Sequence, residues 1–184
     1  EREMPWLVGA NYSPASAINQ LEMWQADSFD PQQIDKELAW GQSLGFNSMR
    51  VFLHHLLWEQ DSEGLLKRMD EFLDIAEQHK IGVMFVLFDS VWDPSPKLGP
   101  QRPPQQGVHN SGWVQSPGQD ILKDPARQDE LKDYVQGVIG HFSYSEPAAL
   151  AGASCGGLGR SHRIVRLAPA GGGSRRTQAG AGRS

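Results

Sequence analysis

Three side chains in this sequence are candidates for acting on a bound substrate: Arg50, Glu59 and Asp89. Asp89 follows the apolar run 81–88, where a carboxylate is costly unless it binds a ligand or has a partner. Arg50 lies within the apolar segment 46–53, and a buried guanidinium requires an anionic or multiply accepting partner. We predict that Arg50 orients a substrate and that Asp89 and Glu59 are the catalytic carboxylates. The alternatives are a structural ion pair of Arg50 with Asp89 or Glu59, and a Glu59 that caps a helix or lies in solvent.

Eight further residues could bind a substrate by hydrogen bonding or ring stacking. They lie at or beyond the ends of apolar segments: Asn11, Tyr12, His54, Trp92, Asp93, His109, Asn110 and Trp113. Tryptophan rings suit the C–H faces of sugars, although loop tryptophans also anchor loops. His54 and His55 would point to opposite faces if they continued a strand, so only one could line a pocket. A buried, hydrogen-bonded structural histidine is the alternative for His54.

A metal site is a less favoured alternative. Imidazole and carboxylate are ordinary metal ligands, and the candidates are His54, His55, His109 and Asp89. No H-x-x-x-H or C-x-x-C spacing supports such a site, and no glycine-rich phosphate loop follows a strand. We therefore expect neither a metal nor another cofactor.

The elements that must position these residues alternate between strands and helices. Apolar runs of strand length occupy 6–12, 46–53 and 81–88. Segments with apolar residues at helical spacing occupy 30–44, 62–79 and 129–142. Alternation of this kind predicts parallel βαβ units and an α/β fold. The carboxyl ends of parallel strands meet at one edge of the sheet, where binding sites form.

Local signals mark one helix and one long loop. Asp30 followed by Pro31 predicts a helix N-cap and first turn, and Gly45 predicts its C-terminal end. The loop 90–125 is far longer than the 2–6 residues usual after a strand. Because it contains tryptophans and hydrogen-bonding side chains, we expect it to contribute to the site.

The composition changes near residue 144, which divides the chain into 1–143 and 144–184. Residues 146–184 contain six arginines, no lysine and one acidic residue, among many glycines and alanines. Arginine without lysine suggests a segment read out of frame, with a natural basic tail as the alternative. We expect this tail to be poorly ordered, although 164–167 could dock as a strand.

The charge and hydropathy of the whole chain limit the classes of partner that it could bind. The net charge of −5 argues against nucleic acid. No apolar stretch reaches the ~20 residues that span a bilayer, so we expect no membrane partner. No signal peptide is expected from the first residues, and the compartment stays open. Cys155 is the single cysteine.

Three segments carry a resemblance to a known family. They are 9–12, 44–52 and 86–93, with the sequences GANY, LGFNSMRVF and VLFDSVWD. They resemble the first three strands of a cellulase-type glycoside hydrolase, of the family 5 enzymes in the clan A barrels. The resemblance covers roughly 4–143. Because a (β/α)8 barrel typically needs about 250 residues, it implies half of a TIM barrel, with three to four parallel strands and covering helices.

The resemblance also implies roles for particular residues. In that clan an arginine on the second strand helps to hold the nucleophile, and Arg50 occupies the matching place. The acid/base glutamate belongs to an Asn-Glu-Pro motif at the end of the fourth strand. Here Glu146 and Pro147 match two letters of the motif, but they follow a predicted helix. The nucleophile glutamate of the seventh strand has no counterpart.

Two functions therefore remain open. The first is hydrolysis of β-1,4-linked polysaccharide, as in an endoglucanase, through a site rebuilt at an oligomer interface. The second is a catalytically inactive truncated barrel that folds, self-associates and at most binds glycans. Retaining glycosidases need two carboxyl groups about 5–5.5 Å apart, which the first function must supply from Asp89 and Glu59. An open sheet edge and an exposed apolar inner face would favour a homo-oligomer.

Overall fold

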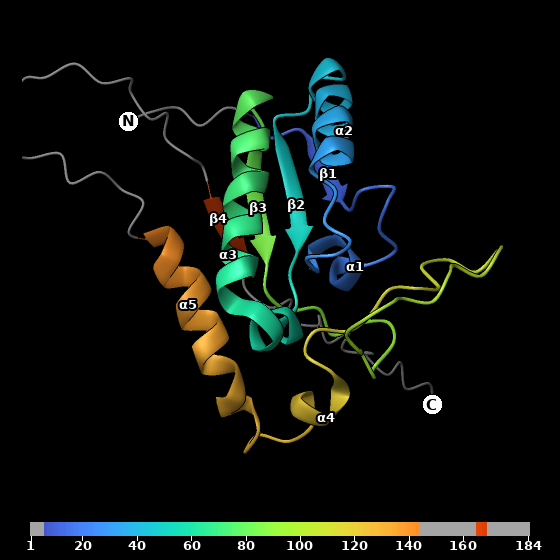
Figure 1. Cartoon of the computed structure of the whole chain (residues 1–184), viewed down its shortest axis with the longest axis vertical. Helices are drawn as coiled ribbons and strands as arrows, with labels where there is room; N and C mark the ends of the chain where they lie inside the picture. The colour runs from blue at the N-terminus through green and yellow to red at the C-terminus, as the bar shows by residue number, and fades with distance from the viewer. Residues whose placement is uncertain (1–5, 144–164, 169–184) are drawn as a thin grey trace, which may run out of the picture.

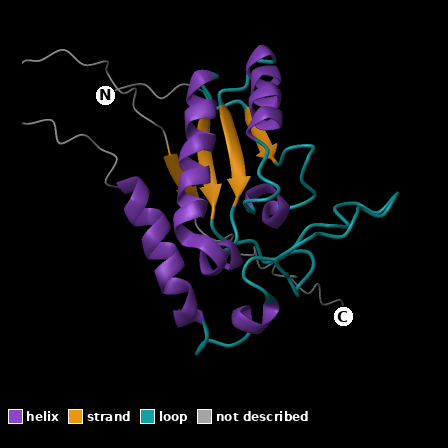
Figure 2. Ribbon diagram, in the orientation of Figure 1, coloured by secondary structure: helices purple, strands orange, loops and turns teal. Residues whose placement is uncertain are grey.

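The protein is an α/β domain in which helices cover one side of a parallel sheet (Figures 1 and 2). The computed structural model describes residues 6–143 and 165–168. The strands in this part are β1 (Gly9–Tyr12), β2 (Ser48–Phe52), β3 (Gly82–Val86) and β4 (Val165–Ala168). The helices are α1 (Gln20–Trp24), α2 (Pro31–Ser43), α3 (His55–Gln78), α4 (Gln119–Leu122) and α5 (Lys132–Ser143), with a 3-10 turn at Gln128–Leu131.

The strands pair in sequence order, β1-β2-β3-β4, and every pairing is parallel. This order confirms the predicted α/β class and is compatible with part of a (β/α)8 barrel. No closed barrel forms among the described residues. The strand predicted at 164–167 is present as β4, whereas the remainder of the segment 144–184, Glu146 and Pro147 included, lies outside the described residues.

The hydrophobic core lies between the sheet and its helices. Helices α2, α3 and α5 run side by side along the sheet (Figure 1). Met49, Val51, Val83 and Phe85 are buried toward them. Trp24 packs edge-on against Phe85, with ring centroids 6.2 Å apart. Burying this apolar surface supplies most of the driving force for the fold.

The other face of the sheet carries different side chains. Because side chains alternate along a strand, Asn11 and Arg50 lie on this face, and both are exposed. Phe52 and Met84 share it and are half-buried. Within the described residues no helix covers this face (the uncovered face), and it is partly polar, where an exposed apolar inner face was predicted (Figure 1).

The predicted boundaries of α2 are confirmed, whereas the predicted start of α3 was wrong. The Asp30 side chain caps α2 by accepting from the backbone N–H of Gln33 at 3.0 Å, and Gly45 adopts a φ of 85° after its end. Helix α3 begins at His55 rather than at 62, with a non-helical residue at Asp61. The prediction missed this start because two helical segments meet there across a kink.

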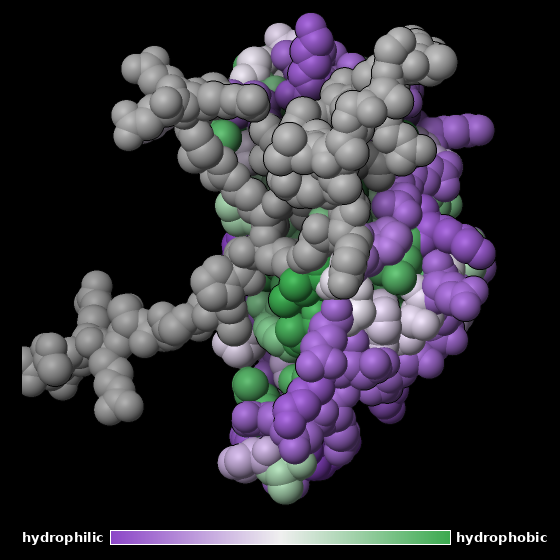
Figure 3. All heavy atoms as spheres, turned by 90° about the vertical axis from the view of Figure 1, so that its left-hand side faces the viewer, coloured by the Kyte–Doolittle hydropathy of each residue, from purple (hydrophilic) through white to green (hydrophobic). Residues whose placement is uncertain are grey.

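The exposed surface mixes hydrophobic and hydrophilic side chains. Trp40 on α2 is 55% exposed and lies under the Lys36 ammonium at 5.1 Å. On the side shown in Figure 3, a hydrophobic area is bordered below by hydrophilic side chains. Within the described residues, no helix combines the length and the apolar character needed to cross a bilayer.

Candidate functional site

A small pocket with a cavity volume of about 50 Å³, open to solvent, lies at the carboxyl ends of β1 and β2. Its walls come from these strands, from α1 and from two parts of the segment after β3. The lining residues are Asn11, Tyr12, Ser13, Asn19, Gln20, Met23, Phe52, Asp89, Trp113 and Val114. Four predicted site residues therefore meet here: Asn11, Tyr12, Asp89 and Trp113.

Asp89 supplies the carboxylate of this pocket. Its backbone exchanges two hydrogen bonds with Ser116, N–H to O at 2.6 and 2.7 Å, which bring the end of the long loop back to β3. Its Oδ1 accepts from the backbone N–H of Val91 at 3.1 Å. No ion pair joins Asp89 to a cation in the part of the chain described. The half-buried carboxylate is therefore fixed in position and able to accept hydrogen bonds from a ligand.

Aromatic rings extend from the pocket into the loop. Trp113 contacts Phe52 at 6.3 Å and Trp92 at 5.7 Å between ring centroids, and Trp92 contacts His109 at 5.8 Å. Trp92 adopts a φ of 81°, which is uncommon for a bulky side chain and is found where surrounding structure enforces it, often at functional sites. These four residues, the aromatic row, form a continuous run of rings from β2 to the exposed His109.

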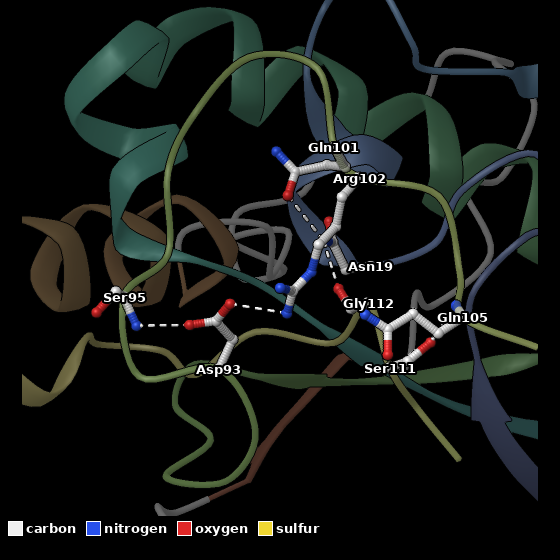
Figure 4. Close-up of polar contacts among 8 residues, drawn as sticks. All are labelled: Asn19, Asp93, Ser95, Gln101, Arg102, Gln105, Ser111 and Gly112. Carbon is white, nitrogen blue, oxygen red and sulfur yellow. Dashed lines mark hydrogen bonds and ion pairs between the residues drawn. The ribbon is translucent and has the colours of Figure 1, made fainter. Parts of the chain in front are cut away.

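Helix α1 fixes the returning part of the loop. Asn19 caps α1 through its Oδ1, and its Nδ2 donates to Gly112 O and to Gln101 Oε1, each at 2.9 Å (Figure 4). Gln20 Nε2 donates to Val114 O at 3.0 Å. These bonds hold the backbone around Trp113 and thereby set the position of its ring.

Two residues that were predicted to bind substrate, Asp93 and Asn110, stabilise the loop instead of lining the pocket. Asp93 pairs with Arg102 at 2.9 Å through one carboxylate oxygen and accepts from Ser95 N–H at 3.0 Å through the other (Figure 4). The carbonyl of Asn110 accepts from Trp113 N–H at 3.0 Å, and its φ of 51° turns the chain there. Both residues shape the loop that carries the aromatic row.

His54 is engaged entirely within the protein. Its Nε2 lies 2.9 Å from the carbonyl of Gln115, and its Nδ1 accepts from Leu56 N–H at 3.2 Å as the N-cap of α3. The expectation that His54 and His55 point to opposite faces was wrong, because α3 begins at His55. Their rings stack with centroids 4.8 Å apart, and both are buried. His54 therefore acts as a buried structural histidine.

Arg50 does not form the structural ion pair with Asp89 or Glu59 that was the alternative to a role in substrate binding. The prediction assumed burial, whereas Arg50 lies exposed on the uncovered face of the sheet. Its Nη1 donates to Asn11 Oδ1 at 3.3 Å, and its Cζ lies 4.8 Å from the Phe52 ring centroid. Asn11 and Phe52 both line the pocket, so Arg50 borders it.

Glu59 lies apart from this arrangement. It is exposed on α3 and does not line the pocket. Partial burial raises its pKa, and the negative charge of Glu130 raises it further against the opposing charge of Arg127. The predicted pairing of Glu59 with Asp89 across a substrate therefore finds no support in the pocket.

No protein-family model, no curated protein and no solved structure matches the chain. The similarity to family 5 glycoside hydrolases accordingly remains a prediction that rests on the three segments quoted above.

Several pocket residues were not predicted. Phe52 could have been found from its spacing, because it stands two residues after Arg50 and shares its face of the strand. Asn19 followed by Glu22 is a helix-capping pattern in the sequence. Gln20 and Met23 carry no local signal, since only the tertiary fold brings α1 to the pocket.

The described residues contain no group of three or more His, Cys, Asp or Glu side chains that could hold a metal ion. His54, the strongest imidazole candidate, uses both ring nitrogens within the protein. The side chains that line the pocket supply one carboxylate, amide and hydroxyl groups, and aromatic rings.

Proposed function

We propose that the pocket and the aromatic row bind a β-linked glycan. The observation that carries the proposal is the presence of the Asp89 carboxylate and the Trp113 ring in one pocket. A sugar presents C–H faces that pack on an aromatic plane and hydroxyl groups that donate to a carboxylate. The aromatic row would accommodate further sugar units along the loop.

Hydrolysis of β-1,4-linked polysaccharide is the second candidate. It is favoured by the position of Asp89 just beyond the end of β3, at the edge of a parallel sheet where catalytic groups are commonly found. Glycoside hydrolysis uses two carboxyl groups that flank the bond, and Asp89 is the one acidic residue among those that line the pocket. A hydrolytic site therefore needs a second carboxylate from a residue beyond this lining or from a second copy of the chain.

We also propose that the half barrel expected from the sequence self-associates. Among the described strands, β1 is paired on one side only, and an unpaired edge can add another strand. Trp6, which precedes β1, is 87% exposed, and Leu44 is 74% exposed. Asn47 bonds to the Trp6 carbonyl at 2.8 Å, which keeps this apolar segment near the end of α2. Light scattering coupled to size exclusion should show a dimer or larger species; a stable monomer at high concentration would contradict self-association.

Glycan binding is tested by isothermal titration calorimetry with cellohexaose. The affinity of the full parent chain is compared with that of the Asp89→Asn variant. The substitution removes the negative charge while keeping the size of the side chain, and we expect about tenfold weaker binding. Asp129→Asn is the matched control, because Asp129 is an exposed partner of Lys132 and does not line the pocket. Equal affinity of the parent and Asp89→Asn, or no binding by the parent, would contradict the proposal.

Hydrolysis is tested separately by reducing-sugar release from β-glucan, mannan, xylan and carboxymethylcellulose. Release by the parent and by Asp129→Asn, but not by Asp89→Asn, would support the second candidate. Binding without release would leave a glycan-binding protein.

A further inference from the structure

Arg50 has no anionic partner in the described part of the chain, although its side chain is held in a defined position. Its recorded contacts are the 3.3 Å hydrogen bond to Asn11 and the Phe52 ring. No acidic side chain of the described residues lies within ion-pair distance of it. A guanidinium has five N–H donors, so most of its hydrogen-bonding capacity is unused.

The neighbours of Arg50 orient its side chain but supply no negative charge. Asn11 stands directly opposite Arg50 in the parallel register of β1 and β2. Phe52 lies two residues further along the same strand face, and its ring attracts the cation without supplying a hydrogen-bond acceptor. The planar guanidinium is therefore held in position and remains exposed on the uncovered face of the sheet.

This cation lies beside the proposed glycan site. Asn11 and Phe52, its two contacts, are part of the pocket wall that also contains Asp89 and Trp113. A ligand stacked on Trp113 would therefore meet a carboxylate at Asp89 and, at the rim, the guanidinium of Arg50. The first group suits sugar hydroxyls, and the second suits a planar carboxylate, which arginine binds through two parallel hydrogen bonds.

We propose that Arg50 forms a subsite for a sugar carboxylate, so that the preferred glycan is acidic and carries a uronate beside neutral units. This inference rests on the proposed function. It restricts the ligand to an oligosaccharide in which a carboxylate sits at Arg50 while hydroxyl groups face Asp89. A polymer with a carboxylate on every unit is disfavoured, because one of them would meet the Asp89 carboxylate.

The experiment compares two ligands that differ at one position. Cellotetraose and the same tetrasaccharide with one glucose oxidised to glucuronate are titrated into the full chain at low and at high salt. We expect the acidic ligand to bind about tenfold more tightly at low salt, with the advantage reduced by salt. Free glucuronate at the same concentrations serves to separate a general carboxylate site from a glycan subsite, and we expect it to compete weakly.

Variants assign the effect to Arg50. Arg50→Gln should bind the two tetrasaccharides with equal affinity, and Arg50→Lys should keep part of the preference through charge alone. Arg127→Gln is the control, because Arg127 is exposed, pairs with Glu130 and does not line the pocket. Since Arg50 is exposed, its variants should unfold at the parent temperature, which circular dichroism checks.

The outcomes separate this inference from the proposed function. Equal binding of both tetrasaccharides by the parent would overturn the acidic subsite and leave glycan binding intact. A preference that survives in Arg50→Gln would overturn the assignment to Arg50. Binding of neither ligand would overturn both proposals.

Discussion

The Nε2 atom of His54 lies 2.9 Å from the carbonyl oxygen of Gln115, which joins the end of β2 to the returning part of the long loop. The Nδ1 atom of the same ring accepts from the N–H of Leu56. One nitrogen must therefore donate and the other accept, which only the neutral ring with its proton on Nε2 can do. Burial, together with the neighbouring His55, lowers the pKa of His54 to about 3, against the hydrogen bond to Gln115, which raises the pKa. Burial also lowers the pKa of His55, to about 4.

These shifts predict that the protein loses stability in mild acid. In the unfolded chain both histidines titrate near pH 6.5, so below that pH the unfolded state binds protons that the folded state excludes. The stabilisation is complete above pH 6.5 and declines as the pH falls toward 4. Each histidine contributes a loss of up to about 1.4 kcal/mol per pH unit in this range. Urea unfolding at a series of pH values from 7.5 to 4.5 measures the slope.

The variant His54→Asn measures how much of this pH dependence of the free energy of unfolding comes from the His54 ring. His54→Asn keeps an oxygen that can cap α3 but removes one titrating group, so its free energy of unfolding should fall less steeply with acid. The variant should also be less stable at neutral pH, because the amide is smaller than the buried ring. A slope identical to that of the parent would contradict the role assigned to His54.

Local sequence signals predicted most elements of the fold. The apolar runs that became β2 and β3 are too short for helices and rich in residues that suit strands. The cap at Asp30 and the turn at Gly45 depend on chemistry within a few residues. Such signals act before any tertiary contact forms, which explains why they could be recognised.

The site was less accessible to prediction because it depends on long-range placement. The start of α3 at His55 changes the side-chain period, which stacks two histidines that a strand would have separated. Whether Arg50 is buried depends on what covers the second face of the sheet, and no local pattern encodes that. Asp89 and Trp113 meet because the returning loop pairs through Ser116 with the backbone of Asp89, just beyond the end of β3.

Removing the Trp113 ring should abolish most glycan binding. Trp113 and Phe52 are the two members of the aromatic row that line the pocket, and Trp113 contacts both Phe52 and Trp92. We expect Trp113→Ala to weaken cellohexaose binding at least about tenfold, because the stacking surface is lost. Trp40→Ala is the control, since this ring is 55% exposed on α2. Equal losses in both variants would indicate a general effect and contradict the assignment.

Asn19 should contribute to stability through two separable sets of hydrogen bonds. It is 3% exposed, caps α1, and donates to Gly112 and Gln101. We expect Asn19→Ala to lower the free energy of unfolding by about 2 kcal/mol, from a lost cap and an unsatisfied buried carbonyl. Asn19→Ser restores a capping oxygen but is too short to replace both donors, so it should recover about half of the loss. Full recovery in Asn19→Ser, measured by urea unfolding, would show that the loop contacts contribute nothing.

Two glycines of α5 predict opposite effects of the same substitution. At Gly140 a new methyl group would meet no atom of the described residues within 4 Å, so Gly140→Ala should stabilise the protein by up to about 1 kcal/mol through helix propensity. At Gly137 the methyl carbon would overlap the Trp58 ring, which donates to Asp133 at 2.9 Å and would have to move. Because the displaced ring joins α3 to α5, Gly137→Ala should destabilise by about 1–3 kcal/mol despite the same gain in propensity. Thermal unfolding of the two variants compares them directly, and a rise in melting temperature for Gly137→Ala would mean that Trp58 is not packed against α5 at this position.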